Sequence, residues 1–444
     1  MRFSTKDIIK LIIPIILECL LAITIGMFDG IMVASEGENA VSGVSLTSAL
    51  DVFLVVFFTA LCAGGGIVIS QFFGKKDLEK SRETAKQLLY ATIVISLVIA
   101  IPVGIFHSPL LHLIYGSVET EVMKNAEIYF ITLAISYPFL AISNAGNTVL
   151  RAQGRTKVTL YNSLIINAFN IGGNALLIYV FKMGVLGAGI ATLTARIIGS
   201  ILSLAMCLKK KENGVYIEKL FHYKPNGNLI KRICIIGIPS GLENSFFQLG
   251  RLLVASLVSS FGTASIAANA VSQTLANFHW TVGGAIGTGL STVVGICIGA
   301  GLKDEAKQNV KKILIFNYAC FILLSIFFSL SVGLFSTLYN LSAEASALNA
   351  NITYISCIAC ATIWPLAFTL PHALRAASDI KFPMIISIAS MWVFRVGGSY
   401  LVSHLFGIGL YSIWVGMIAD WLFRAIFFII RYKSGKWLNK YADN

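Results

Sequence analysis

Long apolar segments, separated by short polar ones, run through the whole chain. The first of them, residues 11–33, reads LIIPIILECLLAITIGMFDGIMV. It is long enough to cross a bilayer, because about 20 helical residues span the hydrocarbon layer. Comparable segments recur and predict twelve spans, centred near residues 20, 58, 97, 134, 169, 197, 246, 283, 323, 359, 393 and 420. The pattern therefore predicts an all-α polytopic membrane protein with twelve transmembrane helices.

The composition supports this class of protein. Of the 444 residues, 56% are hydrophobic and only 12% are charged, and the mean hydropathy is +0.79. A soluble protein of this length needs far more charge to cover its surface. The first apolar segment is too long for a cleavable signal peptide, and no small-residue cleavage site follows a short core. We therefore expect this helix to stay in the mature chain.

The basic residues follow the predicted topology. The net charge is +13, and with the N-terminus inside the cell nearly all Lys and Arg fall on cytoplasmic segments. The exceptions are Lys124 and Lys182 on outer segments and four arginines within spans. This positive-inside bias predicts that both termini are cytoplasmic. The charge thus reflects topology, and we expect no nucleic-acid partner.

The chain contains a repeat with an offset of 224 or 225 residues. LIIPIILECL near residue 11 returns as IGIPSGLENS near residue 236, and the register pairs Pro14 with Pro239, Glu18 with Glu243, Arg151 with Arg375, and Gly172 with Gly397. Six spans per half is an even number, so both halves enter the membrane from the same side. Parallel repeats of this kind place a transporter's substrate site between the lobes. We predict lobes at 1–208 and 229–444, joined by a polar, lysine-rich cytoplasmic linker at 209–228.

Asp29 is an acidic residue in the first span, whereas the equivalent position of the second half is Val254. An intramembrane carboxylate indicates a functional site, since a charge at a helix centre costs about 2.5–3.5 kcal/mol on insertion scales. Polar residues in three other spans of the same half are candidate partners, namely Asn144, Asn147, Asn170, Asn174 and Thr192. A single amide can equally hold two helices together, but the set taken with Asp29 favours a functional cluster.

The chemistry of this cluster fits a proton or a sodium ion. Burial favours the neutral carboxyl group, while hydrogen bonds to the carboxylate favour its charged form. Carboxylate, amide and hydroxyl oxygens are also ligands that hard cations prefer. The residues leave both coupling ions open.

The sequence predicts less specific roles for the other polar residues and for the proline within the spans. Pro14 gives the first helix a place to bend and is a candidate hinge. Glu18 and Glu243 fit either packing at a helix start or cation coupling. Asp420 and Arg424, four residues apart, predict a structural ion pair, and Arg395 is near in span order. The remaining candidates, which could face a cavity, are Gln248, Asn269, Gln273, Asn277 and His279.

No spacing typical of a catalytic or metal site stands out. The sequence shows no Ser/His/Asp, Cys/His or metal-ligand arrangement. We therefore expect a protein that is not an enzyme and that binds no cofactor or metal.

Several motifs resemble those of the multidrug and toxic compound extrusion (MATE) transporters over essentially the whole chain. They are FDGIMV at 28–33, QFFGKKD at 71–77, LRAQG at 150–154, and the second-half echoes GIPSG, FGTASIAAN and IGAGLKDEA. The resemblance implies a bacterial membrane protein of the DinF-like branch, with two six-helix lobes forming a V around a central cavity. It also implies export of mostly cationic, amphipathic compounds in exchange for protons or sodium.

By this resemblance Asp29 is the cation-coupling aspartate, and its hydrogen-bonded partners are Asn144, Asn147, Asn170 and Thr192. Many members of that branch have a second aspartate where this chain has Asn174. The difference favours a single-aspartate proton or sodium site over a two-acid proton relay. The acidic residue of other branches in span seven lies further along than Glu243, so its role does not transfer to Glu243.

These observations predict a cation-coupled antiporter in the bacterial cytoplasmic membrane that exports small organic molecules by alternating access. Cation binding at Asp29 would alter the hydrogen bonds of spans one, five and six, and span one would bend near Pro14. The alternative is a flippase for lipid-linked oligosaccharide or lipid II, which would need cavity-facing arginines such as Arg251 and Arg395. A channel or a sensor is disfavoured, because neither pore-lining charge rings nor an appended soluble domain is seen. Nothing in the sequence demands more than a monomer, and the substrate's identity is left open.

Overall fold

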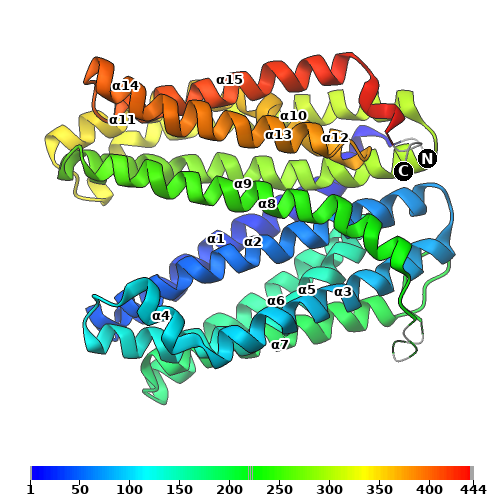
Figure 1. Ribbon diagram of the computed structural model, residues 1–444, viewed down its shortest axis with the longest axis horizontal. Coiled ribbons are helices and arrows are strands. Elements are labelled where there is room, and N and C mark those ends of the chain that lie inside the picture. The colour runs from blue at the N-terminus through cyan, green and yellow to red at the C-terminus, as the bar shows by residue number, and fades with distance from the viewer. Residues whose placement is uncertain (1–2, 219, 221, 223, 441–444) are drawn as a thin grey trace. The chain divides into compact units, whose positions relative to one another are not determined.

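The computed structural model describes residues 3–218, 220, 222 and 224–440, and every regular element in them is a helix (Figure 1). The chain divides into two compact units. One is Ile13–Gly241, and the other combines Met1–Ile12 with Leu242–Asn444. The division falls within α1 (Thr5–Ala34) and within α8 (Gly227–Ser259), so each of these helices contributes to both units.

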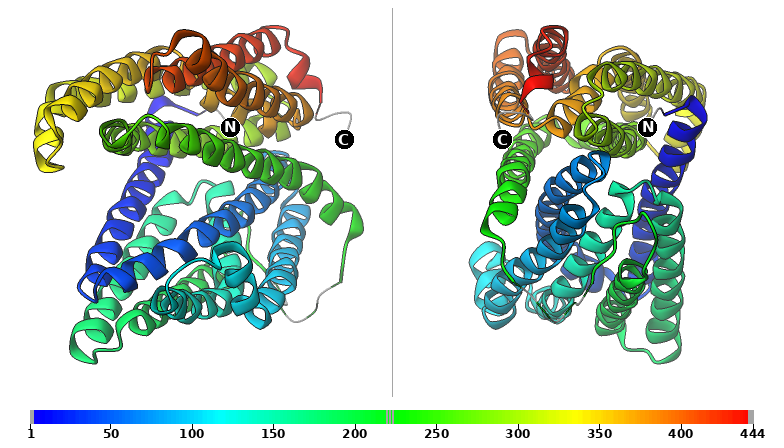
Figure 2. Two further views of the ribbon diagram at one scale, coloured as in Figure 1. Left: turned by 60° about the vertical axis from the view of Figure 1, so that its left-hand side comes forward. Right: turned by 90° about the vertical axis from the view of Figure 1, so that its right-hand side faces the viewer.

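The remaining long helices of the first unit are α2 (Glu38–Gly74), α3 (Leu78–Ile105), α5 (Thr120–Ala152), α6 (Thr156–Asn174) and α7 (Gly184–Leu208). The π-helix η1 (Ala175–Val180) extends α6, and the short α4 (His107–Tyr115) follows α3. Helix α5 packs against α2, α3 and α7 and so forms the centre of this unit (Figure 2). Its central place explains why apolar residues such as Phe130, Leu133 and Tyr137 are almost fully buried.

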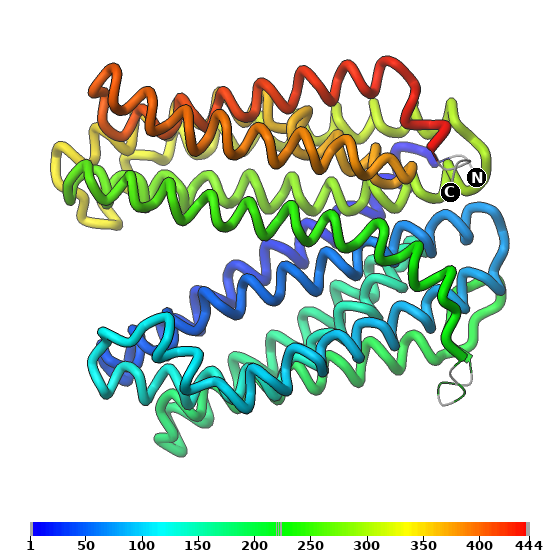
Figure 3. The backbone as a smooth tube through the Cα atoms, in the orientation of Figure 1, coloured from blue at the N-terminus to red at the C-terminus, as the bar shows by residue number. Residues whose placement is uncertain are grey.

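The second unit continues with α9 (Thr263–Gly299), α10 (Lys303–Leu338) and α11 (Ala343–Thr362). Next come η2 (Pro365–Thr369) with α12 (Leu370–Ala376), then α13 (Lys381–Ser390) with the π-helix η3 (Met391–Gly398) and α14 (Ser399–Phe406). The last elements are α15 (Tyr411–Lys433) and the 3-10 helix η4 (Lys436–Asn439). Helix α9 is the most buried of the candidate spans, packing against α10, α11 and α12, and Figure 3 traces it as a long yellow-green helix.

The predicted spans correspond to these helices. Within the described residues, ten helices are long and apolar enough to cross a membrane, and an eleventh span is the pair α11 and η2–α12, bent by 55°. Helix α8 has 33 residues but carries charges at Lys231, Arg232, Glu243 and Arg251, so it is too polar to count by hydropathy. The all-α, polytopic class predicted from the sequence is confirmed. Helix α4 was not predicted, because its nine residues are too few for a span.

Equivalent positions of the repeat have the same local structure. Gly37 precedes α2 with a φ of 100°, and Gly262 precedes α9 with a φ of 88°. Side chains with a Cβ rarely adopt this left-handed conformation, so glycine permits the sharp entry into both helices.

The segment predicted as a linker is partly packed. Val215, Tyr216 and Ile217 are buried, and Arg82 of α3 stacks over the Tyr216 ring with its guanidinium carbon 4.0 Å from the ring centroid. Its described residues thus dock on the first unit. The predicted boundaries at 208 and 229 stay a prediction.

Candidate functional site

Asp29 lies near the C-terminal end of α1 and is held by two amides from α6. Asn174 Nδ2 donates a hydrogen bond to Asp29 Oδ1 at 2.6 Å. The Asn170 amide, with its nitrogen turned towards the carboxylate, donates to Oδ1 at 2.8 Å and to Oδ2 at 3.2 Å. Asn170 and Asn174 can reach the same group because residues four apart share one face of a helix. Both are buried, and Asp29 is half-buried.

One hydrogen-bond acceptor beside Asp29 has no partner. The side-chain oxygen of Asn174 is buried and has no hydrogen-bond partner, which is unusual because buried polar atoms are nearly always satisfied. The π-helix η1 begins at the next residue, and such segments are frequent at functional sites. A carboxylate beside an unpaired amide oxygen, in a mostly apolar helix, is chemically suited to hold a proton or a small hard cation.

The other candidate partners of Asp29, which the sequence predicts on α5 and α7, make different contacts. Thr192 of α7 is hydrogen-bonded to Tyr129 of α5, and Tyr129 lies within electrostatic reach of Asp29. Asn147 accepts a hydrogen bond from Asn162 Nδ2 at 3.5 Å, while Asn144 is half-buried on α5. Among the described residues, no direct hydrogen bond joins Thr192, Asn144 or Asn147 to Asp29, so the structure gathers Asp29, Asn170 and Asn174 most closely.

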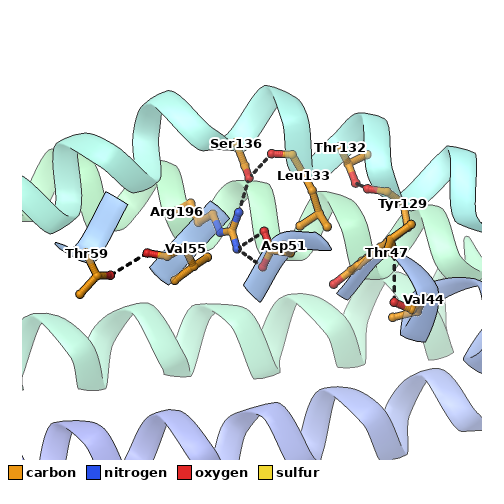
Figure 4. A network of polar contacts seen from close by, with 10 residues as sticks. All are labelled: Val44, Thr47, Asp51, Val55, Thr59, Tyr129, Thr132, Leu133, Ser136 and Arg196. Carbon is orange, nitrogen blue, oxygen red and sulfur yellow. Dashed lines mark hydrogen bonds and ion pairs between the residues drawn. The ribbon is translucent and has the colours of Figure 1, made fainter. Parts of the chain in front are cut away.

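A second polar network in the same unit was not foreseen from the sequence. Arg196 of α7 donates through Nη2 to Asp51 Oδ1 at 3.1 Å and Oδ2 at 2.9 Å, and through Nη1 to Ser136 Oγ of α5 at 2.7 Å (Figure 4). The side chains of Arg196 and Asp51 are 14% and 17% exposed. Tyr129 is electrostatically coupled to this pair as well as to Asp29. The available signal was Arg196 itself, since an arginine within a span implies an acidic partner.

Glu18 and Glu243 occupy matching ion pairs, one in each unit. Arg151 and Thr159 donate to the two carboxylate oxygens of Glu18. Arg375 Nη2 donates to both oxygens of Glu243, at 2.8 and 2.7 Å. The repeat pairs Glu18 with Glu243 and Arg151 with Arg375, so each acid meets the arginine of its own half. These contacts give both acids a role in holding helices together.

Asp420 of α15 is fully buried between two arginines. Arg424 Nε donates to Asp420 Oδ1 at 2.7 Å, which is the pairing that the four-residue spacing predicts. Arg395 Nε of η3 lies 3.1 Å from Oδ2. Arg424 Nη2 also donates to the carbonyl of Ser387 at 2.9 Å. The trio joins α13, η3 and α15.

The candidate cavity residues are spread over α8 and α9. His279 is 1% exposed, its Nε2 lies 3.0 Å from Ser325 Oγ, and its ring packs against Phe321 and Phe328 with centroids 5.3 and 5.5 Å away. It therefore lies inside the α9–α10–α11 bundle. The other four candidates, Gln248, Asn269, Gln273 and Asn277, are half-buried, and their cavity role stays a prediction.

Pro14 lies inside α1, which runs without a break from Thr5 to Ala34. Its hinge role stays a prediction. Among the described residues, no group of three or more His, Cys, Asp or Glu is arranged to hold a metal ion.

Comparison with known proteins places the chain in a family. The MatE family model matches residues 14–176 and again 239–401, two segments that begin 225 residues apart, as the repeat does. The uncharacterized transporter YisQ of Bacillus subtilis is 27% identical, covering 98% of this chain and 96% of its own length. A probable multidrug resistance protein, NorM of Thermotoga maritima, is 24% identical over 97% of this chain and 93% of its own.

Solved structures show the same fold. A mutant of the Vibrio cholerae MATE transporter VcmN matches with a TM-score of 0.89 at 17% identity, over 97% of this chain and 96% of that one. A MATE protein in the bent conformation also reaches 0.89, at 18% identity and the same coverage. Because the family model matches both halves and most of the chain, the protein belongs to the MatE family, that of the multidrug and toxic compound extrusion transporters.

Proposed function

We propose that this protein is a cation-coupled antiporter that exports amphipathic, mostly cationic organic compounds across the bacterial cytoplasmic membrane. The observation that carries the proposal is Asp29, an acidic residue within an apolar helix whose carboxylate accepts hydrogen bonds from Asn170 and Asn174. The names of relatives such as the Thermotoga maritima NorM support drug export as the activity. We place both termini in the cytoplasm, where the basic residues gather, and propose that the monomer is the working unit.

The site can couple an ion to a conformational change through α1 and α6. A proton or sodium ion at Asp29 cancels the charge that the two amides now stabilise, and so changes the hydrogen bonds between α1 and α6. Asn174 ends α6 where η1 begins, a point where the backbone hydrogen-bond pattern already shifts. An ion can drive transport only if it binds two conformations with different affinities, and these amides supply a contact that differs between them.

Proline positions support bending of the shared helices. Helix α1 passes from one compact unit to the other between Ile12 and Ile13, next to Pro14, and α8 does so between Gly241 and Leu242, close to Pro239. Proline removes a helical hydrogen bond and favours a kink. Both prolines therefore stand where a rocking motion between units needs flexibility.

The test is efflux of ethidium from loaded cells that express the native chain, Asp29→Asn or Asp304→Asn under imposed proton and sodium gradients. Asp304 is exposed in the first turn of α10 and provides a matched control. We expect efflux that follows one of the two gradients in the native chain and in the control, and loss of that dependence in Asp29→Asn. Gradient-driven efflux that survives Asp29→Asn unchanged would remove Asp29 from the mechanism.

A further inference from the structure

Three arginines of the second unit, Arg251, Arg395 and Arg424, lie on α8, η3 and α15, and one acid, Asp420, contacts two of them. Arg395 of η3 and Arg424 of α15 both contact Asp420, at 3.1 and 2.7 Å. Arg251 of α8 lies within electrostatic reach of Arg395. Unlike the other two arginines, Arg251 is exposed.

Phe247 links Arg251 to the other two arginines. The guanidinium carbon of Arg395 lies 4.9 Å from the centroid of the Phe247 ring, and that of Arg424 lies 5.9 Å away. Arg251 follows Phe247 by four residues, one helical turn, so both occupy the same face of α8. Helix α8 packs on η3 and α14, since Phe246 meets Trp392 of η3 edge-on and Tyr400 of α14 donates to the carbonyl of Leu253. The exposed Arg251 is therefore positioned at the edge of the Arg395–Asp420–Arg424 cluster.

The cluster carries uncompensated positive charge. Three guanidinium groups and one carboxylate leave an excess of two positive charges. The nearby acids of this unit are engaged elsewhere, Glu243 with Arg375 and Asp379 with Arg431. Buried charge is expensive unless it is paired, and intramembrane arginines usually mark a functional path. A negatively charged group would balance this excess.

The repeat allows the residues of this cluster to be compared with the equivalent residues of the first half. The offset of 225 that pairs Gly172 with Gly397 also pairs Asn170 with Arg395. It pairs Asp29 with Val254, which lies one turn beyond Arg251 on α8. The position of Asn170, which donates to the Asp29 carboxylate in the first half, thus carries Arg395 in the second half, where the position of Asp29 is the uncharged Val254. The second half therefore lacks the acid of the first half and has a positive charge in place of one of its amides.

We propose that Arg251 and Arg395 form a binding site for the acidic group, carboxylate or phosphate, of an amphipathic molecule that the protein transports. Arg251 is the exposed first contact, and Arg395, fixed by Asp420 and Phe247, supplies the second charge. On the same face of α8, the Phe247 ring and the half-buried Val254, one turn beyond Arg251, suit the apolar body of such a molecule. The inference rests on the proposed transport function and extends its substrate class to acidic or zwitterionic amphiphiles.

The experiment measures binding, so that it is independent of coupling. The full chain in phosphatidylcholine nanodiscs is titrated with dodecyl phosphate and with dodecyltrimethylammonium, two probes with the same alkyl chain and opposite charge. We expect dodecyl phosphate to bind, and to lose about tenfold or more of its affinity in Arg251→Gln, because a charge-assisted hydrogen bond is removed. The affinity for dodecyltrimethylammonium should not fall in the same variant. Arg251→Lys should retain much of the affinity, and Arg155→Gln, in the loop between α5 and α6, should bind like the native chain.

Further arms separate the sources of the acidic group. Nanodiscs that contain phosphatidylglycerol should weaken dodecyl phosphate binding only if a lipid headgroup occupies the site, and inorganic phosphate should compete only if the head group alone suffices. Weaker binding in phosphatidylglycerol nanodiscs supports the site and indicates a lipid headgroup as its ligand, and competition by inorganic phosphate supports it and indicates a small anion. Intact binding with neither effect supports the site and indicates that the whole amphiphile is needed. Equal dodecyl phosphate affinity in the native chain and Arg251→Gln, with both folded by size-exclusion chromatography, would overturn the proposal, as would an equal loss of affinity for the cationic probe in that variant. Asp29→Asn should still bind dodecyl phosphate, so failure of coupling and failure of this site are distinguishable.

Discussion

Removal of the Asp51 carboxylate should destabilise the first unit by leaving Arg196 charged and unpaired. In the native chain Arg196 makes two hydrogen bonds to Asp51 and one to Ser136. With both side chains less than one fifth exposed, Asp51→Asn keeps the shape of the site but removes its negative charge. The arginine then has to be buried without a counter-charge or pull towards water, away from Ser136.

The size of the effect follows from the geometry. Unit charges 2.9 Å apart attract by about 6 kcal/mol at an effective dielectric constant of about 20. Desolvation offsets much of this attraction, and breaking one partner of a buried pair costs about 3–5 kcal/mol. The double variant Asp51→Asn/Arg196→Gln should be more stable than either single variant, because it buries no unpaired charge.

The assay is thermal unfolding of the purified protein in detergent for the native chain, the two single variants and the double variant, with Asp304→Asn as control. We expect both single variants to unfold at lower temperature and the double variant to recover part of the loss. Strict additivity of the two single effects would refute the reasoning, since contacting charges should show a coupling energy. So would a native-like unfolding temperature in Asp51→Asn.

Two further predictions concern packing and the paired acids. Gly64→Ala should lower the unfolding temperature, because a Cβ at Gly64 would lie 2.6 Å from the backbone nitrogen of Gly237. Gly26→Ala is the control and should not lower it, since a Cβ there meets nothing within 4 Å. Equal effects of the two substitutions would contradict this packing. Glu243→Gln should lower the unfolding temperature, because the Glu243 carboxylate accepts two hydrogen bonds from Arg375. The ion dependence of efflux should stay unchanged in this variant. A changed ion dependence in the efflux assay would show a coupling role for Glu243 instead.

The hydrophobic pattern and the repeat are sufficient to predict most of the fold. Span length and apolar composition locate the long helices, because the bilayer sets a minimum helix length. The pattern does not reveal α4, which is too short, nor the π-helical segments η1, η2 and η3, which depend on local packing. It also cannot show that the compact units divide inside α1 and α8, since that depends on which helices touch.

Spacing along one helix predicts which candidate residues share a face, but it does not predict which residues of different helices meet. Asn170 and Asn174 fall on one face by their spacing, and both reach Asp29. By contrast, no spacing connects Asp51 of α2 with Arg196 of α7, because the contact arises only when the helices pack. Arg395 and Asp420 likewise meet across two elements. Intramembrane charge identifies such residues as important, but only the structure names their partners.

The most direct test of the central claim, that Asp29 binds the coupling ion, is counter-ion flux in liposomes that contain the purified protein. Ethidium is supplied on one side, and proton and sodium movement in the opposite direction is recorded for the native chain and for Asp29→Asn. The account predicts that ethidium transport by the native chain is matched by flux of one of these ions, and that Asp29→Asn loses this flux. Counter-flux of the same size in Asp29→Asn would contradict the account.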